Sequence, residues 1–128
     1  MKPIILDSGA VTFLARKSRQ AATSIQLAGQ RDSWLTVVPS LVLVECLSGQ
    51  QRTDAVVNRF IKSYSVVDGP HERLARRAGF LRTQAGRGSA VDAVVVAMAE
   101  PGGAVLTGDT EDLRALAAHA RDVSVFGM

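Results

Sequence analysis

The chain has 128 residues, a length that suits one domain spanning residues 1–128. Hydrophobic residues make up 47% and charged residues 21%, which excludes a disordered chain, and a single cysteine excludes an internal disulfide framework. The net charge of +3 rests mainly on arginine, which suits phosphate, although a solvated arginine surface is the simpler interpretation. The apolar runs are too short for a membrane span or a signal peptide, so we expect a soluble, cytoplasmic protein with no membrane partner.

The pattern of apolar residues predicts strands that alternate with helices. In chain order, we expect a strand at 3–6, helices at 8–17 and 21–30, a strand at 35–38, helices at 40–48 and 53–61, a strand at 65–67, helices at 72–84 and 89–100, a strand at 104–107, a helix at 110–119 and a strand at 123–126. Ser40 is expected to cap its helix. Such β–α repeats predict an α/β fold with a parallel sheet covered by helices on both faces.

Two acidic residues come just after predicted strands, where ligands bind in parallel α/β sheets. Asp7 directly follows Ile4-Ile5-Leu6, and Asp109 follows the strand that ends at Thr107, with Gly108 permitting a tight turn. Capping of the next helix is an alternative role for Asp7, and for Asp109 it is the simpler one.

Two further acids interrupt apolar helices. Glu45 lies in the run 41–47, and its helical neighbours carry no charge, which favours a functional role over a solvent-facing position. Asp92 lies in a helix that is apolar nearly all round and is therefore expected to be buried. Ser89 and Asp92 also fit a capping box, a role that leaves a carboxylate oxygen free for a metal.

Four acids on separate β–α units could meet at one edge of the sheet, and clustered carboxylates need a counter-charge. A hard cation such as Mg²⁺ or Mn²⁺ fits, because it takes oxygen ligands. Zinc is disfavoured, since there is no cysteine pair and His71 and His119 fit no ligand spacing. We interpret both histidines as surface groups and Cys46 as a small core residue.

Four segments of the chain, each of which contains one of the four acids, resemble the PIN-domain family, in its branch of small single-domain toxins of the VapC type. The resemblance covers essentially the whole chain and rests on the segments 4–10, 38–45, 89–93 and 106–113, in that order. It implies a three-layer α/β/α sandwich with a central, mainly parallel sheet. It also implies Mg²⁺- or Mn²⁺-dependent endoribonuclease activity that inhibits translation by cutting tRNA or rRNA, a homodimer, and a cognate antitoxin of the VapB type that docks across the active site.

The resemblance also assigns site residues. The family's acids fall on Asp7, Glu45, Asp92 and Asp109, with Asp112 as an auxiliary acid. Whether Asp109 or Asp112 faces the metal stays open. Ser8 and Thr107 match positions where a hydroxyl supports the acids.

For the mechanism, we expect Asp7, Asp92 and Asp109 to hold one metal ion directly or through water, with a second ion entering with the substrate. Glu45 would complete that site or orient the attacking water, and the products would carry 5′-phosphate and 3′-hydroxyl ends. Arginines would hold backbone phosphates; the candidates are Arg87 first, then Arg16, Arg73 and Arg77, although a solvated position is the simpler interpretation of each. No aromatic platform for single strands is visible in the sequence, so specificity is expected to depend on RNA shape as well as exposed sequence.

Rival interpretations remain. A phosphorylation-dependent receiver domain has similar length and alternation, but Asp7 is followed by Ser8 rather than by a second acid, Asp68 is only a loose match to the phosphate acceptor, and no lysine follows Lys62. A catalytically silent PIN-like scaffold that only binds RNA or protein is a second alternative. A DNA-directed nuclease of the same chemistry is a third, for which the chain is short.

Overall fold

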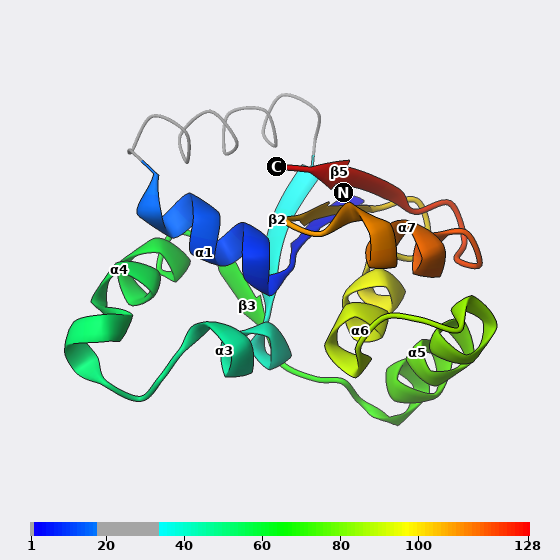
Figure 1. Ribbon diagram of the computed structural model, residues 1–128, viewed down its shortest axis with the longest axis horizontal. Helices are drawn as coiled ribbons and strands as arrows, with labels where there is room; N and C mark the ends of the chain where they lie inside the picture. Colours follow the sequence, from blue (N-terminus) through cyan, green and yellow to red (C-terminus); the bar gives the residue numbers. More distant parts are fainter. Residues whose placement is uncertain (1, 18–33) are drawn as a thin grey trace.

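The computed structural model describes residues 2–17 and 34–128 (Figure 1). Its strands are β1 (Lys2–Leu6), β2 (Trp34–Pro39), β3 (Ser65–Val67), β4 (Ala104–Thr107) and β5 (Ser124–Gly127). They form one sheet in the order β3-β2-β1-β4-β5, and every pairing is parallel. The predicted parallel sheet is therefore confirmed.

Helices cover both faces of this sheet. They are α1 (Ser8–Arg16), α3 (Ser40–Cys46), α4 (Gln51–Ile61), α5 (Glu72–Ala85), α6 (Ala90–Ala99) and α7 (Thr110–Ala117). Figure 1 shows α1 and α4 on one side of the strands and α5, α6 and α7 on the other, which confirms the predicted three layers. None of the helices that the structure describes is long and apolar enough to cross a membrane. The predicted helix at 21–30 lies outside the described residues.

The core lies where the central strands meet α1 and α6. Ile5, Leu6 and Val105 are almost completely buried, because a parallel sheet covered on both faces offers its central strands no exposed side. Helix α6 is buried over most of its surface through Val95, Val96 and neighbouring small residues, as its apolar composition predicts.

The chain between α3 and α4 departs from the prediction. Helix α3 ends at Cys46 rather than at Ser48, because the residues that follow it form hydrogen bonds with Asp54 on α4 instead of continuing the helix. The Asp54 carboxylate accepts hydrogen bonds from the Ser48 N–H and hydroxyl, both at 2.9 Å, and from the Gly49 N–H at 2.8 Å. The N-cap position of α3 is Pro39, and Ser40 is already helical, so the prediction that Ser40 caps this helix is wrong.

The strand order reverses between β1 and β4, and we call the region beyond the carboxyl ends of these two strands the crevice. The chain runs from β1 outward through β2 to β3 and then returns to β4 on the other side of β1, and ligands of parallel α/β folds bind at such a reversal point. Leu6 pairs with Leu106, so Asp7 and Thr107 are the next neighbours at the carboxyl ends. A receiver domain has the order 2-1-3-4-5, and the receiver interpretation is therefore wrong.

The far end of α6 is fixed by an ion pair. Glu100, whose side chain is 8% exposed, accepts two hydrogen bonds from Arg77 on α5, at 2.8 and 2.7 Å, and a third from the Arg121 N–H at 2.7 Å. These contacts lower the pKa of Glu100, with the Arg77 hydrogen bonds as the largest cause. The ion pair thus joins α5, the end of α6 and the chain before β5.

We expect Glu100→Gln to lower the free energy of unfolding at neutral pH by about 1–3 kcal/mol, because it breaks a largely buried, charge-assisted contact. Since the pKa of Glu100 is lowered by folding, its contribution is present above the ordinary glutamate pKa and is lost as the pH falls through the lowered value. The difference between the two proteins in urea titrations should therefore shrink in acid.

The matched control is Glu72→Gln, which breaks the pair between Glu72 and Arg76, whose side chains are 81% and 78% exposed. This change should cost less than about 0.5 kcal/mol. Equal losses in the two variants, or a Glu100→Gln loss that does not change with pH, would contradict the assignment.

Candidate active site

Asp7 is the most constrained residue at the crevice. It is 5% exposed, and one carboxylate oxygen accepts the Ala10 N–H at 2.8 Å, so Asp7 caps α1. The other oxygen accepts a hydrogen bond from the hydroxyl of Thr107, which is fully buried at the end of β4. The Thr107 oxygen in turn accepts the Asp109 N–H at 2.8 Å. One carboxylate thus joins the end of β1 to the turn that follows β4.

Two glycines allow these segments to approach each other. A Cβ atom at Gly9 would lie 3.3 Å from the Cα and N atoms of Gly108 and 3.5 Å from an Asp7 carboxylate oxygen. A side chain at Gly9 would therefore force the β4–α7 turn to shift slightly, whereas a Cβ atom at Gly108 would lie 3.5 Å from the Gly9 Cα, an ordinary contact distance. Sequence reasoning assigned Gly108 to a tight turn but missed Gly9, since the contact joins residues that are far apart in the sequence.

Asp92 combines two of its predicted features. It is half-buried, and it forms the predicted capping box with Ser89, whose hydroxyl accepts the Asp92 N–H at 3.0 Å while the Asp92 carboxylate accepts the Ser89 N–H at 3.2 Å. The carboxylate is therefore fixed at the first turn of α6. The structural role is established, and the catalytic role stays a prediction.

The acids at the crevice act on each other electrostatically. Burial raises the pKa of Asp7 and outweighs the hydrogen bonds from Thr107, Ala10 and Gly108, and the charge of Asp109 raises it further. Burial is also the main cause of the raised pKa of Asp92, to which the charges of Asp7 and Asp112 add. The ionised forms of Asp7 and Asp92 are therefore disfavoured, and a cation beside these two carboxylates would be stabilised.

Asp109 and Asp112 lie at the start of α7. Asp109 is exposed and caps the helix by accepting the Glu111 N–H at 3.3 Å, as its simpler interpretation predicts. Asp112 accepts a hydrogen bond from Arg87 at 2.6 Å, and the same guanidinium contacts Glu111 at 3.0 Å. Arg87 thus supplies part of the counter-charge that these acids require.

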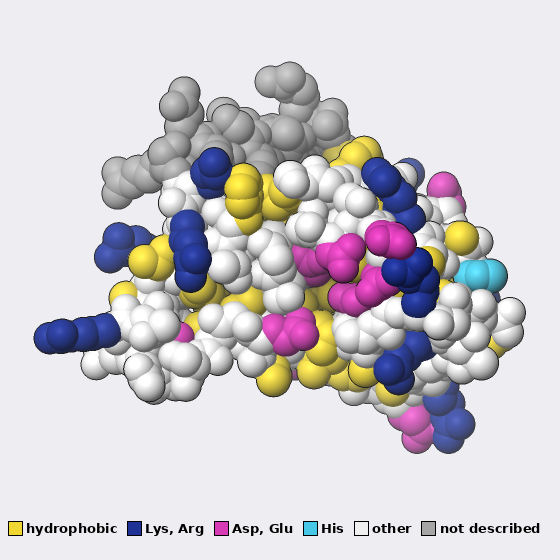
Figure 2. Space-filling model, in the orientation of Figure 1, with side chains coloured by type: hydrophobic (Ala, Val, Ile, Leu, Met, Phe, Trp, Pro, Cys, Tyr) yellow, Lys and Arg dark blue, Asp and Glu magenta, His cyan; other side chains and the backbone are white. Residues whose placement is uncertain are grey.

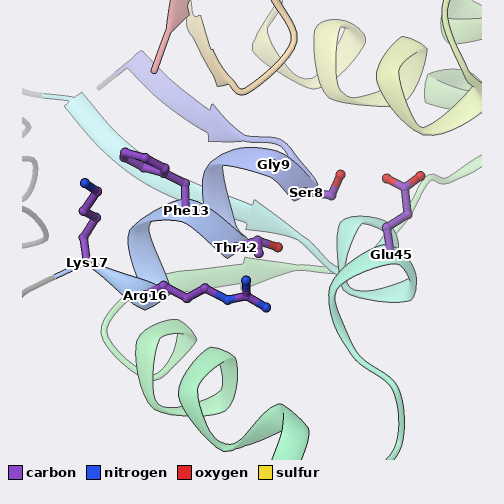
Figure 3. Close-up of a pocket in the computed structure, with 7 residues that line it drawn as sticks. All are labelled: Ser8, Gly9, Thr12, Phe13, Arg16, Lys17 and Glu45. Atoms are coloured by element: carbon purple, nitrogen blue, oxygen red, sulfur yellow. The ribbon is translucent and has the colours of Figure 1, made fainter.

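Glu45 differs from its expected environment. The functional role was predicted because the helix around Glu45 is apolar and offers no evident solvent-facing side. In the structure, however, α3 buries only Val42, Glu45 is exposed, and neighbouring Val44 is 73% exposed. The burial on which that prediction relied is therefore wrong. What connects Glu45 with the other acids is its position: its side chain lines a pocket beside Ser8 and Gly9 (Figure 3).

Cys46 holds α3 against the start of α1. Its Sγ donates to the Ser8 carbonyl at 3.6 Å and accepts from the Thr12 hydroxyl at 3.9 Å, and the partly buried side chain packs against the core as expected. Burial raises the pKa of the thiol, and the charges of Glu45 and Asp7 raise it further. This thiol thus lies between the two acids and stays protonated at neutral pH.

The acids fit a hard cation only in part. In residues 2–17 and 34–128, no three carboxylate, thiol or imidazole groups converge closely enough to hold a metal ion by themselves. The available donors are all carboxylate oxygens, however, and Mg²⁺ is commonly bound through one or two carboxylates while it keeps several waters. Asp7 and Asp92 supply two such carboxylates, and the charge of Asp7 raises the pKa of Asp92, an effect that a cation beside them would oppose.

The other candidate arginines occupy different surroundings. Arg77 is paired with Glu100 at the end of α6 opposite Asp92, where it supports the fold. Arg73 is exposed on α5, and Arg16 is exposed at the end of α1. Contacts of these three arginines with RNA stay predictions. The position of Arg77 gives no support to its predicted contact.

A pocket of about 580 Å³ runs beside α1 (Figure 3). Its lining residues are Ser8, Gly9, Thr12, Phe13, Arg16, Lys17 and Glu45. Phe13 is 42% exposed, and the Lys17 ammonium lies 4.7 Å from the centre of its ring. The sequence analysis did not predict that Phe13 would be exposed in a pocket, because a single aromatic residue in an amphipathic helix is usually part of the core.

The surface has a corresponding charge distribution. Figure 2 shows acidic side chains gathered near the middle of the displayed face, with lysine and arginine side chains on both sides of them. A phosphate backbone could therefore be attracted from either side while the acids face its centre.

Comparisons with known proteins support the fold. The chain is similar to a chain in the crystal structure of VapBC2 from Rickettsia felis bound to a DNA fragment from their promoter, with a TM-score of 0.74 and 13% identity. The match covers 98% of both chains. No family model and no curated protein matches the chain in sequence. The fold is thus the PIN-like α/β fold that the sequence predicts.

We expect Asp7→Asn to stabilise the metal-free protein by up to about 1 kcal/mol, a gain typical of relieving strain at a functional site. The raised pKa means that folding favours the neutral carboxyl group, so the ionised form costs stability as the pH rises above the ordinary value. Asparagine is neutral and retains the oxygen that accepts the Ala10 N–H. Thermal unfolding at neutral pH would measure the gain.

Thr107→Val is the matched comparison at the same contact. It keeps the shape of the side chain but leaves Asp7 and the Asp109 N–H without their buried partner, which should cost about 1–3 kcal/mol. Loss of stability in Asp7→Asn equal to that in Thr107→Val would show that the Asp7 charge stabilises the fold.

Proposed function

We propose that the protein is a metal-dependent endoribonuclease that acts as the toxin of a toxin–antitoxin pair. The observation that carries this proposal is the buried Asp7 carboxylate at the reversal point of the sheet, where it shares one electrostatic field with Asp92 and Asp109. Carboxylates whose pKa is raised by burial and by a neighbouring charge are typical of catalytic sites. The similarity to a VapBC2 chain supports the proposal through the fold.

In this proposal, Asp7 and Asp92 hold Mg²⁺ or Mn²⁺, and Asp109 or Asp112 contributes through water. A bound cation would supply an activated water and stabilise the leaving oxygen of the phosphodiester. The chain's own part is to hold the carboxylates still: Thr107 and the Ala10 N–H fix Asp7, and the capping box fixes Asp92. This arrangement reduces the reorganisation that the reaction would otherwise require.

Glu45 and Ser8 extend the site toward the pocket. Their side chains lie at the same end of the pocket, away from Phe13 and Lys17 (Figure 3). An exposed carboxylate in that position can orient a water molecule against a phosphate that reaches the aspartates. Arg87 would exchange its contact with Asp112 for a substrate phosphate when a cation neutralises the acids.

The partners follow from the same proposal. The similar solved structure is a complex of VapBC2 with promoter DNA, which supports a protein partner of the VapB type for this chain. We propose that this antitoxin covers the acidic crevice and that the free toxin is a homodimer that cuts tRNA or rRNA and so inhibits translation. A small reading frame beside the gene would be consistent with such an antitoxin.

The second candidate is a silent scaffold of the same fold that binds RNA or protein without cutting it. The electrostatic influence of Asp109 on Asp7, and of Asp7 and Asp112 on Asp92, disfavours it, because neighbouring carboxylates repel phosphate and would weaken a surface that only binds RNA.

The test is cleavage of total RNA by the purified, partner-free chain in Mg²⁺, Mn²⁺ or EDTA. We expect cleavage with either metal, none in EDTA, and products with 5′-phosphate and 3′-hydroxyl ends. Asp92→Asn should reduce the rate by about 100-fold or more, because it removes a proposed ligand while the asparagine side-chain oxygen can still accept the Ser89 N–H of the capping box.

The matched control is Asp122→Asn, at a residue with a φ of 55°, which asparagine also adopts readily. Asp122 precedes β5 and so lies at the opposite edge of the sheet from the crevice; this variant should cut RNA like the unmodified chain. Products with 2′,3′-cyclic phosphate, or equal activity of folded Asp92→Asn, would overturn the metal-dependent mechanism. Absence of cleavage under every condition by folded protein would favour the scaffold.

A further inference from the structure

We propose that the pocket beside α1 is the subsite for an unpaired stretch of RNA next to the cut, in which Phe13 stacks on a base and Arg16 binds a phosphate. This inference rests on the proposed ribonuclease function and adds the form of the substrate. It follows from the chemistry of the pocket and from its continuity with the acidic crevice.

The pocket leads away from the acids along α1. Ser8 and Glu45 lie at one end, and Phe13 and Lys17 lie at the other (Figure 3). Five residues of helix separate Ser8 from Phe13, a rise of roughly 7 Å. A base on Phe13 would therefore belong to a nucleotide close to the phosphate that reaches Asp7.

Phe13 is not required to fill the core. The buried face of α1 is formed by Ala10, Val11 and Leu14, whereas Phe13 is 42% exposed in the pocket. Exposed aromatic rings in basic grooves are typical stacking platforms for the bases of single strands. Lys17, whose ammonium lies 4.7 Å from the ring centre, places a positive charge beside the ring.

The charges of the pocket favour a phosphate backbone over a protein segment. Among residues 2–17 and 34–128, no carboxylate forms an ion pair with Arg16 or Lys17, whereas Arg76, Arg77 and Arg87 are paired. Figure 3 shows the Arg16 side chain extended along the pocket toward Thr12. Two cations that have no ion pair with the described residues, beside an aromatic ring, match alternating phosphates and bases.

The substrate must be unpaired at this point. In a duplex each base is stacked on its neighbours and its face is inaccessible, so Phe13 can stack only on a base in a loop, a bulge or a single-stranded segment. The subsite would thus select unpaired RNA by access to a base face, without reading the identity of the base.

The experiment measures RNA binding in the Asp92→Asn background with Mg²⁺, so that cleavage does not interfere. The probe is a fluorescein-labelled single-stranded RNA of mixed sequence, and fluorescence anisotropy compares it with the same RNA annealed to its complement. We expect the single strand to bind more tightly. Phe13→Leu should weaken its binding by about fivefold or more and remove the preference over the duplex.

Arg16→Gln should weaken binding and reduce the slope of log Kd against log salt by about 0.7, the value for one lost phosphate contact on a single strand. Phe13→Tyr should bind like the background protein, because tyrosine keeps the stacking surface. The control is Phe80→Leu on α5, since Phe80 is also exposed and also lies near a cation, with the Arg77 guanidinium 5.3 Å from its ring centre. This variant should leave RNA binding unchanged.

The inference is overturned if Phe13→Leu and Arg16→Gln, folded by circular dichroism, bind the single strand like Phe80→Leu, or if duplex and single strand bind equally. Loss of binding to a protein partner with unchanged RNA binding would assign the pocket to that partner instead. If the unmodified chain cuts RNA while these variants behave like the control, only the subsite fails. If they lose RNA binding but the unmodified chain never cuts, the nuclease proposal fails, and the pocket is a binding site for unpaired RNA rather than a subsite beside a cut.

Discussion

Burial of a single carboxylate at the end of β1 is the constraint on which the candidate site depends. Asp7 is held by the Ala10 N–H from one side and by the Thr107 hydroxyl from the other, so it caps α1 and joins two central strands at once. Close approach of Gly9 and Gly108 makes this contact possible. Helix α6 then brings Asp92 to the same place, and the strand order ensures that the place is a crevice.

The arrangement of acids that would bind a cation also lowers the stability of the metal-free fold. Burial first, and then the charges of neighbouring acids, raise the pKa of Asp7 and Asp92, which means that the folded chain holds these two charges at a cost. Arg87 offsets part of that cost through Asp112 and Glu111, and a bound cation would offset more. A site built in this way is prepared for a cation, while the ion pair of Arg77 with Glu100 stabilises the fold at the other end of α6.

Much of this could be predicted from the sequence, because short apolar runs fix where buried strands end and therefore where Asp7 and Asp109 lie. The capping box of Ser89 and Asp92 could also be predicted, since it depends on two residues that are three positions apart in the sequence. Contacts between segments that are distant in the sequence could not be predicted. Hydrogen bonds to Asp54 end α3 early, and Glu45 is exposed on this short helix rather than buried. Phe13 was missed because exposure depends on which neighbours cover a helix, and periodicity does not give that.

The most direct test of the account is where a divalent cation binds. Mn²⁺ is paramagnetic, so adding it to isotope-labelled protein should broaden the backbone amide signals of residues close to the bound ion. We expect broadening to begin at Asp7, Asp92 and Gly108 and to be lost there in Asp7→Asn. Broadening that begins elsewhere, for example around the exposed Glu72, or that is unchanged in Asp7→Asn, would contradict a metal site at the carboxyl ends of β1 and β4.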